Sequence, residues 1–177
     1  MAGITFYDAY FPMLIAATDA LEAILVKSQA HAKEHGVDVD ADYVPLRLYE
    51  DMKPFSFQIS IVCNFAGRCV NRLTGDTPDA WEEGEGATFD QLLARVRKTA
   101  ELLKSARPED INGKESTVIE VSLGPKTKKM ECKDYVTLMI LPNVFFHVQT
   151  TYALMRMKGV PLGKMDFLVP FMGAHLN

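Results

Sequence analysis

The chain has 177 residues, 48% of them hydrophobic and 24% charged, and a formal net charge of −4. A chain of this length fits one domain and can bury a core without a metal or a disulfide. We therefore expect a single domain over residues 1–177. The negative charge, with no basic stripe, argues against a nucleic-acid partner.

The three cysteines form no CxxC pair, which is typical of buried thiols in a reducing compartment. The apolar stretch 11–26 contains Asp19 and Glu22. Charges in the middle of such a stretch indicate an amphipathic helix rather than a signal peptide or a membrane span. We expect a cytoplasmic protein with no membrane partner.

The first predicted helix covers residues 8–34. Pro12 is expected in its first turn, where a missing N–H costs little, and Gly36 as its left-handed cap. The loop 37–49 follows, with aspartates at every second position from Asp38. The glycine and glutamate that a calcium loop needs further on are absent, so we interpret this loop as a solvated connection.

Two further helices come next. The second follows Asp51 and is expected to end at Gly75 and Pro78. The third begins at a capping box, in which Thr88 accepts from the first turn and Gln91 reaches back. This third helix should stop at Pro108.

The remaining elements are a hairpin, a long helix and a tail. Residues 117–123 are rich in β-branched side chains, and residues 127–132 can return as a second strand. The last helix covers residues 134–158, in which Pro142 should kink the helix or mark a fresh start. The tail 161–167 is expected to be extended. These elements predict a mainly all-α fold, an antiparallel four-helix bundle with a small β-hairpin before the last helix.

The sharpest candidate site lies on the last predicted helix. Asn143 and His147 are four residues apart and therefore project from one face. Apolar neighbours such as Phe146 would desolvate the imidazole, lower its pKa and keep it neutral at pH 7. Gln58 stands in an otherwise apolar stretch of the second helix. A buried amide needs a partner, so Gln58 could help line a polar spot opposite the last helix. The alternative is an ordinary core histidine that is hydrogen-bonded to a neighbour.

A substrate bound beside this imidazole would contact further side chains. Tyr152 offers a phenol nearby, and Phe55 joins Phe146 in offering apolar surface. His31 and His35 have the spacing of a metal-binding pair. They lie in the charged last turns of the first helix, however, where exposure and the helix dipole explain them.

Five segments carry a family resemblance that covers nearly the whole chain. They are Thr5–Asp8, Ala30–Ala32, Asp51–Phe55 with Gln58, Leu141–Val148 and Gly159–Phe167. With these segments the chain resembles an uncharacterised family of domains of unknown function, with bacterial and fungal members, in the DinB/YfiT-like superfamily of proposed metalloenzymes.

The resemblance implies a DinB-like four-helix bundle that is often a homodimer. In the wider superfamily, three histidines of the second and last helices hold a divalent metal. The matching positions here are Gln58, Asn143 and His147, so one of three metal-binding imidazoles remains. One imidazole and two amides make a poor site for zinc or nickel, and we expect a degenerate site with no metal and no other cofactor.

Functions of different classes fit these observations. The first is a small-molecule-binding protein and metal-independent enzyme (an isomerase, cyclase, dehydratase or hydrolase) that acts on an apolar organic substrate. His147 would be its acid or base, and Asn143 and Gln58 would orient the substrate. The second is a non-catalytic, dimeric structural or interaction protein. The third is a divalent-metal-dependent, DinB-like transferase.

Overall fold

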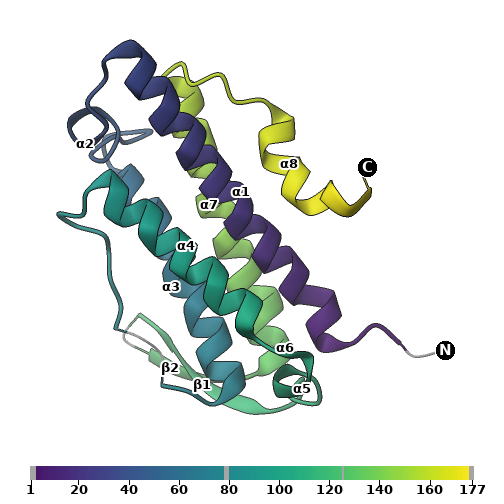
Figure 1. The fold of residues 1–177 in the computed structure, drawn as a ribbon. Coiled ribbons are helices and arrows are strands. Elements are labelled where there is room, and N and C mark those ends of the chain that lie inside the picture. The colour runs from purple at the N-terminus through teal and green to yellow at the C-terminus, as the bar shows by residue number, and fades with distance from the viewer. Residues whose placement is uncertain (1–2, 78–79, 125, 176–177) are drawn as a thin grey trace.

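The computed structural model describes residues 3–77, 80–124 and 126–175, and its long helices lie side by side (Figure 1). The helices of the bundle are α1 (Phe6–His35), α3 (Phe55–Thr74), α4 (Phe89–Ser105) and α7 (Leu141–Met157). α3 packs on α4 and α7, and α1 packs on the same two helices from the other side. The predicted mainly helical four-helix bundle is confirmed.

Two helices of the bundle run in each direction. Phe55 and Phe89 are the first residues of α3 and α4, and their rings stack at 5.8 Å, so these two helices start at the same end. α1 and α7 run the opposite way, and the connection between α3 and α4 therefore returns along the length of the bundle (Figure 1). α3 ends before Gly75, as predicted, whereas Pro78 lies outside the described residues.

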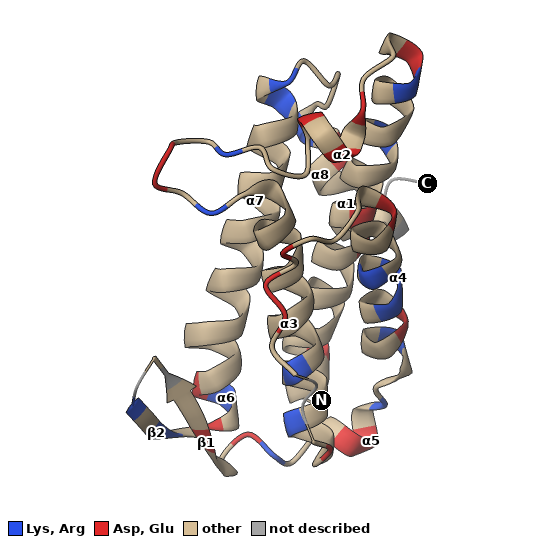
Figure 2. Ribbon diagram, turned by 90° about the vertical axis from the view of Figure 1, so that its left-hand side faces the viewer, with Lys and Arg blue, Asp and Glu red and all other residues tan. Residues whose placement is uncertain are grey.

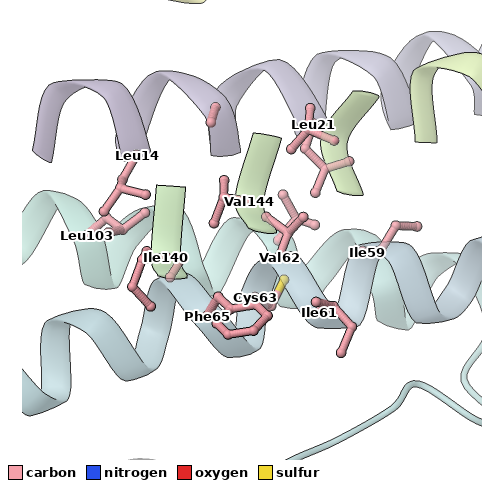
Figure 3. Packing of buried hydrophobic residues seen from close by; sticks show 14 of the residues in the cluster. Leu14, Leu21, Ile59, Ile61, Val62, Cys63, Phe65, Leu103, Ile140 and Val144 are labelled. Carbon is pink, nitrogen blue, oxygen red and sulfur yellow. The ribbon is translucent and has the colours of Figure 1, made fainter. Parts of the chain in front are cut away.

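Side chains of all four helices meet in one apolar layer (Figure 3). Leu21, Val62, Leu103 and Val144 are each fully buried in it. Burial of one such side chain stabilises the fold by roughly 1.5–3 kcal/mol, so this layer holds the helices together. α1 is long and apolar enough to cross a membrane by length and composition, and half of that stretch is buried inside the structure. A signal sequence and the core helix of a soluble protein share these properties.

α1 begins two residues before the predicted start. The Thr5 hydroxyl accepts a hydrogen bond from the Asp8 N–H at 3.1 Å and caps the helix. Pro12 consequently lies inside the helix and not in its first turn, which corrects the prediction. Gly36 ends α1 with a φ of 66°, in the left-handed conformation expected of it.

The predicted loop 37–49 contains a short helix, α2 (Val39–Asp42). Asp38 Oδ1 accepts from the N–H groups of Asp40 and Ala41, at 3.0 and 3.2 Å. Asp40 Oδ1 in turn accepts from the Phe89 N–H at 2.6 Å, at the start of α4. Two of the three aspartates therefore accept hydrogen bonds at the start of a helix. Carboxylates are favoured there because the first N–H groups of a helix have no partner within it.

α4 has the predicted capping box. Thr88 Oγ1 accepts from the Gln91 N–H, and Gln91 Oε1 accepts from the Thr88 N–H at 2.8 Å. The helix ends at Ser105, and Pro108 begins a further short helix, α5 (Pro108–Ile111). Figure 2 shows that charged residues gather on the outer side of α4, so its buried face is the apolar one.

The predicted hairpin is present before the last helix of the bundle. β1 (Val118–Leu123) pairs antiparallel with β2 (Lys126–Glu131), with Val121 opposite Lys128. Only a hairpin that packs on something else is stable in water, and Val121 is accordingly buried in the common core.

The predicted single helix 134–158 changes its winding along its length. It consists of α6 (Cys132–Asp134), the π-helix η1 (Tyr135–Ile140) and α7. Pro142, at the start of α7, has no N–H, and its ring presses against the carbonyl four residues earlier in a regular α-helix. The winding changes from π to α at Leu141, so Pro142 lies in the first turn of α7, at the fresh start that was one of the two alternatives predicted for it.

The tail is helical where an extended segment was expected. The prediction holds for residues 161–163 but is wrong from Lys164, where α8 (Lys164–Met172) begins, followed by the short η2 (Gly173–His175). Asp166 Oδ2 accepts from the Gly163 N–H and caps α8. Phe167 and Phe171 lie one turn apart, and their rings stack with 5.5 Å between centroids. They give α8 an apolar face, which the predicted tail, ending at residue 167, was too short to show.

Candidate functional site

Gln58 and His147 meet between α3 and α7. Gln58 lies in the first turn of α3 and is only 2% exposed, while His147 lies in the second turn of α7 and is half-buried. Gln58 Oε1 and His147 Nδ1 are 2.6 Å apart. The structure thus brings together two residues that are 89 positions apart in the sequence and that the sequence identified separately.

The surroundings of Gln58 fix which atom of His147 carries the proton. Gln58 Nε2 donates to the Lys53 carbonyl at 2.9 Å, so the amide oxygen must face the imidazole. An oxygen accepts, and His147 Nδ1 therefore donates to it. In the neutral ring the other nitrogen, Nε2, then keeps its lone pair, which can accept a proton or a hydrogen bond.

Burial keeps this ring neutral. Desolvation lowers the pKa of His147 from 6.5 to about 4, because the charged form loses its hydration. The neighbouring rings are apolar: Phe57 lies edge-on at 6.1 Å between centroids, and Phe146 edge-on at 5.1 Å. The expected neutral imidazole in apolar surroundings is therefore the form present at pH 7.

Asn143 points its amide to the backbone. Its Nδ2 donates to the Met139 carbonyl at 2.6 Å, one turn earlier and inside η1. That contact stabilises the junction between the π-helix and α7, where Pro142 supplies no N–H. Asn143 thus lies on the same helix as His147, but its hydrogen bond goes to the chain itself.

The other proposed contact residues are spread over different surroundings. Phe146 is 58% exposed and lies beside His147. Tyr152 is half-buried and packs on the core. Phe55 is 0% exposed and stacks on Phe89 of α4, so its ring belongs to the core. Of these three, Phe146 has a position suited to touching a molecule at His147.

The donor atoms at this site do not fit a divalent metal. Gln58 uses both ends of its amide, Asn143 donates from its amide to the backbone, and His147 Nδ1 carries a proton. This leaves Nε2 of one imidazole, whereas zinc needs at least three protein ligands. No group of three His, Cys, Asp or Glu side chains in the described ranges is placed to hold a metal.

The remaining candidate groups from the sequence have ordinary positions. Cys63, Cys69 and Cys132 are buried as free thiols. Burial raises the pKa of Cys63 to about 11 and that of Cys69 to about 12, which makes both poor nucleophiles. His35 Nδ1 lies 2.8 Å from the carbonyl oxygen of His31 at the exposed end of α1.

A groove of about 950 Å³ lies between α3, α4 and residues 80–87, and no motif in the sequence indicated it. On its wall, Asn64 Oδ1 accepts from Arg95 Nη2 at 2.8 Å, and Asn64 Nδ2 donates to the Glu82 carbonyl at 2.6 Å. Arg95 Nη1 also pairs with the Glu82 carboxylate at 3.0 Å. This cluster joins the long connection to the bundle, and its members are too far apart in the sequence to be recognised together.

Residues 6–168 match the model of the DUF1993 family, described as a domain of unknown function. The chain belongs to this family. It is also similar to a DinB family member from Shewanella denitrificans, known from a crystal structure, with 28% identity and a TM-score of 0.78 over 92% of this chain and 90% of that one. No curated protein matches the chain. The resemblance to a DinB-like domain of unknown function is therefore confirmed.

Proposed function

We propose that this DUF1993 domain is a cytoplasmic small-molecule-binding protein in which His147 acts as an acid or base without a metal. The observation that carries the proposal is the hydrogen bond from His147 Nδ1 to Gln58 Oε1. It holds the ring in one tautomer and directs the lone pair of Nε2 away from Gln58. Buried Gln58 acts as a positioning residue, because Lys53 fixes its amide in turn.

The apolar surroundings favour an apolar substrate. Phe57 and Phe146 flank the imidazole, and an organic molecule that covers them would exclude water from Nε2. Nε2 would then accept a proton from the substrate or from a bound water and return it later, as isomerisation, cyclisation, dehydration or hydrolysis requires. A neutral ring is the form that accepts a proton, and the low pKa of His147 maintains it at every pH above about 5.

The accessibility of Nε2 can be tested by chemical labelling. Diethyl pyrocarbonate acylates neutral imidazole, and at about pH 5 histidines of ordinary pKa are protonated. We expect His147 to be labelled at that pH, as measured by peptide mass spectrometry. Labelling of His31 but not of His147 would contradict the proposal.

The chemistry can be tested with an activated apolar ester, 4-nitrophenyl butyrate. We expect the His147→Ala variant to hydrolyse it about 100-fold more slowly than the wild type, and the rate of the wild type to be level above about pH 5. His31→Ala is the matched control, since it removes a histidine outside the site. Equal rates for His147→Ala and the wild type would refute a role of His147 in hydrolysis.

A homodimer that uses the outer face of η1 and α7 is the second candidate function. The chain carries no Asp, Glu, Lys or Arg from Tyr135 to Met155, and Figure 2 shows this stretch without charge colours along its length. Leu138 and Phe146 on it are 68% and 58% exposed. Exposed apolar groups on an uncharged helix are typical of an interface.

Sedimentation of the wild type and of Leu138→Glu distinguishes the two functions. A dimer that becomes a monomer in Leu138→Glu supports an interface on this face. A monomeric wild type rules out the dimer and leaves the proposal for His147 intact.

A further inference from the structure

The hairpin has strand edges that no other strand of the described residues covers. β1 and β2 form a sheet of two strands, so each strand has one edge that faces away from the other. Figure 2 shows the hairpin at one end of the molecule. An edge strand presents a row of unpaired N–H and C=O groups, and another extended chain can join it there.

A hydrogen bond from α3 shows how the two edges lie. Arg72 Nη1 donates to the Glu120 carbonyl of β1 at 3.1 Å, so this carbonyl points away from β2 and towards the bundle. In an antiparallel pair, two residues that lie opposite each other either bond to each other or both point their backbone groups outward. Lys129 lies opposite Glu120. The N–H and C=O of Lys129 therefore point away from β1, at the open edge of β2.

The turn of the hairpin leads to the same assignment. Leu123 and Lys126 lie opposite each other across a connection of two residues, and such a connection closes on a pair whose backbone groups bond to each other. Bonded and outward-pointing pairs then alternate along the strands. Thr127, like Lys129, is therefore a residue whose N–H and C=O point outward.

The open edge of β2 is basic. Lys126, Lys128 and Lys129 stand in one run of four residues with Thr127, and all four are exposed. None of the ion pairs in the described ranges involves these three lysines. Successive side chains of a strand point to opposite faces, so Lys128 and Lys129 place positive charge on both faces of this edge.

The bundle holds the edge in place. Val121 of β1 is buried in the common core, and Arg72 fixes the Glu120 carbonyl beside it. A partner that joins a preformed edge does not lose the free energy that ordering this strand would cost.

The charge of the edge decides which chain can join it. A second copy of β2 would bring lysines against lysines, and like charges on neighbouring strands repel each other. Lysines on edge strands prevent pairing between copies in this way. An extended segment with carboxylates instead gains ion pairs with the lysines in addition to its backbone hydrogen bonds. When a peptide adds a strand to a sheet, the main chain supplies affinity and the alternating side chains supply specificity.

From these observations we propose that the outer edge of β2 binds an acidic, extended peptide segment of another protein. The segment adds a third strand to the hairpin: its backbone bonds to the N–H and C=O groups of Thr127 and Lys129, and its carboxylates face Lys128 and Lys129. Nothing in this contact depends on His147, which lies on α7.

The test follows, by fluorescence anisotropy, the binding of a fluorescein-labelled peptide of about eight residues in which glutamate and valine alternate. We expect saturable binding of this peptide to the full chain. The same peptide with glutamine in place of glutamate should bind at least about 10-fold more weakly, because its interactions with the lysines are no longer charge-assisted. No saturation up to about 1 mM, or equal affinity for the two peptides, overturns the proposal.

Hydrogen exchange, measured by NMR, shows whether the peptide pairs with the strand edge. We expect the N–H groups of Thr127 and Lys129 to exchange at least about 10-fold more slowly in the complex, since they gain hydrogen bonds there. Unchanged exchange of both groups in protein saturated with the peptide shows that charge alone holds it, and strand addition is then refuted.

Variants assign the binding to β2. The double variant Lys128→Gln and Lys129→Gln should bind the glutamate peptide at least about 10-fold more weakly, whereas Lys98→Gln, which alters an exposed lysine of α4, should bind it as the wild type does. Equal losses in the two proteins would refute a role of the β2 lysines.

Thr127→Pro tests the backbone contact and retains every lysine. Proline removes one outward N–H and is tolerated on an edge strand, so we expect a folded variant whose affinity for the glutamate peptide is lower by about 10-fold. A Thr127→Pro protein that is folded by circular dichroism and binds normally contradicts strand addition. Should this variant not fold, the exchange of the Thr127 and Lys129 N–H groups in the wild type decides the same question.

Discussion

Acidification should destabilise this protein through His147 before its carboxylates are protonated. In the folded chain the pKa of His147 is about 4, against 6.5 for an unburied histidine. Between these two values the unfolded chain binds a proton at this residue and the folded chain does not. The unfolded state is therefore favoured as the pH falls from about 6.5 to about 4, and the contribution is constant above and below that window.

The size of the effect follows from the two pKa values. One pKa unit corresponds to about 1.4 kcal/mol, so the free energy of unfolding should fall by about 2 kcal/mol between pH 7 and about pH 5. The full loss, reached below about pH 4, is about 3 kcal/mol. This is a large fraction of the roughly 5–15 kcal/mol that stabilises a typical domain.

Urea unfolding of the wild type and of His147→Gln at the two pH values measures this contribution. The glutamine amide is neutral at any pH, so the variant lacks the titration of the imidazole. Because the carboxylates titrate in both proteins, the difference between them isolates His147. We expect the wild type to lose about 2 kcal/mol more than His147→Gln. An equal loss in the two proteins would falsify the desolvated imidazole on which the proposed site depends.

Three further substitutions test other parts of the structure. Gln58→Glu should raise the pKa of His147 above about 4, because a carboxylate at the same place favours the imidazolium, and an NMR titration of the His147 ring would show no change if the two side chains were apart. Thr88→Ala should lower the free energy of unfolding by about 1 kcal/mol through loss of the cap of α4, measured by urea unfolding; an unchanged midpoint would show that the capping box contributes nothing. Gly84→Ala should destabilise the fold more than Gly86→Ala, although both glycines have a φ of 74°. A Cβ at Gly84 would meet the Ser60 hydroxyl and lie 2.9 Å from the Ser56 carbonyl oxygen, whereas a Cβ at Gly86 would meet open space. The strain of a left-handed residue costs roughly 1–2 kcal/mol in both variants, and equal unfolding midpoints would contradict the close packing at Gly84.

Elements with strong local signals were predictable from the sequence. Thr88 and Gln91 predict the capping box of α4, and Gly36 predicts the end of α1. Both signals depend only on residues that are neighbours in the chain. The hairpin follows in the same way from its β-branched strand and its turn. α8 was missed because its stability comes from contacts outside the segment: Lys27 of α1 pairs with Asp166 at 2.9 Å, and Phe145 of α7 stacks on Phe171.

The candidate site shows the same division. Residue type and helical spacing are enough to predict that His147 is a lone imidazole among apolar residues and that Gln58 needs a partner. The packing of α3 on α7 makes these two residues partners and leaves the Asn143 amide bonded to the backbone, neither of which follows from the spacing of residues. Periodicity reports which face of a helix is buried, but the choice of partner depends on how helices pack and where π turns shift their register. Those are properties of the assembled core and of no single segment.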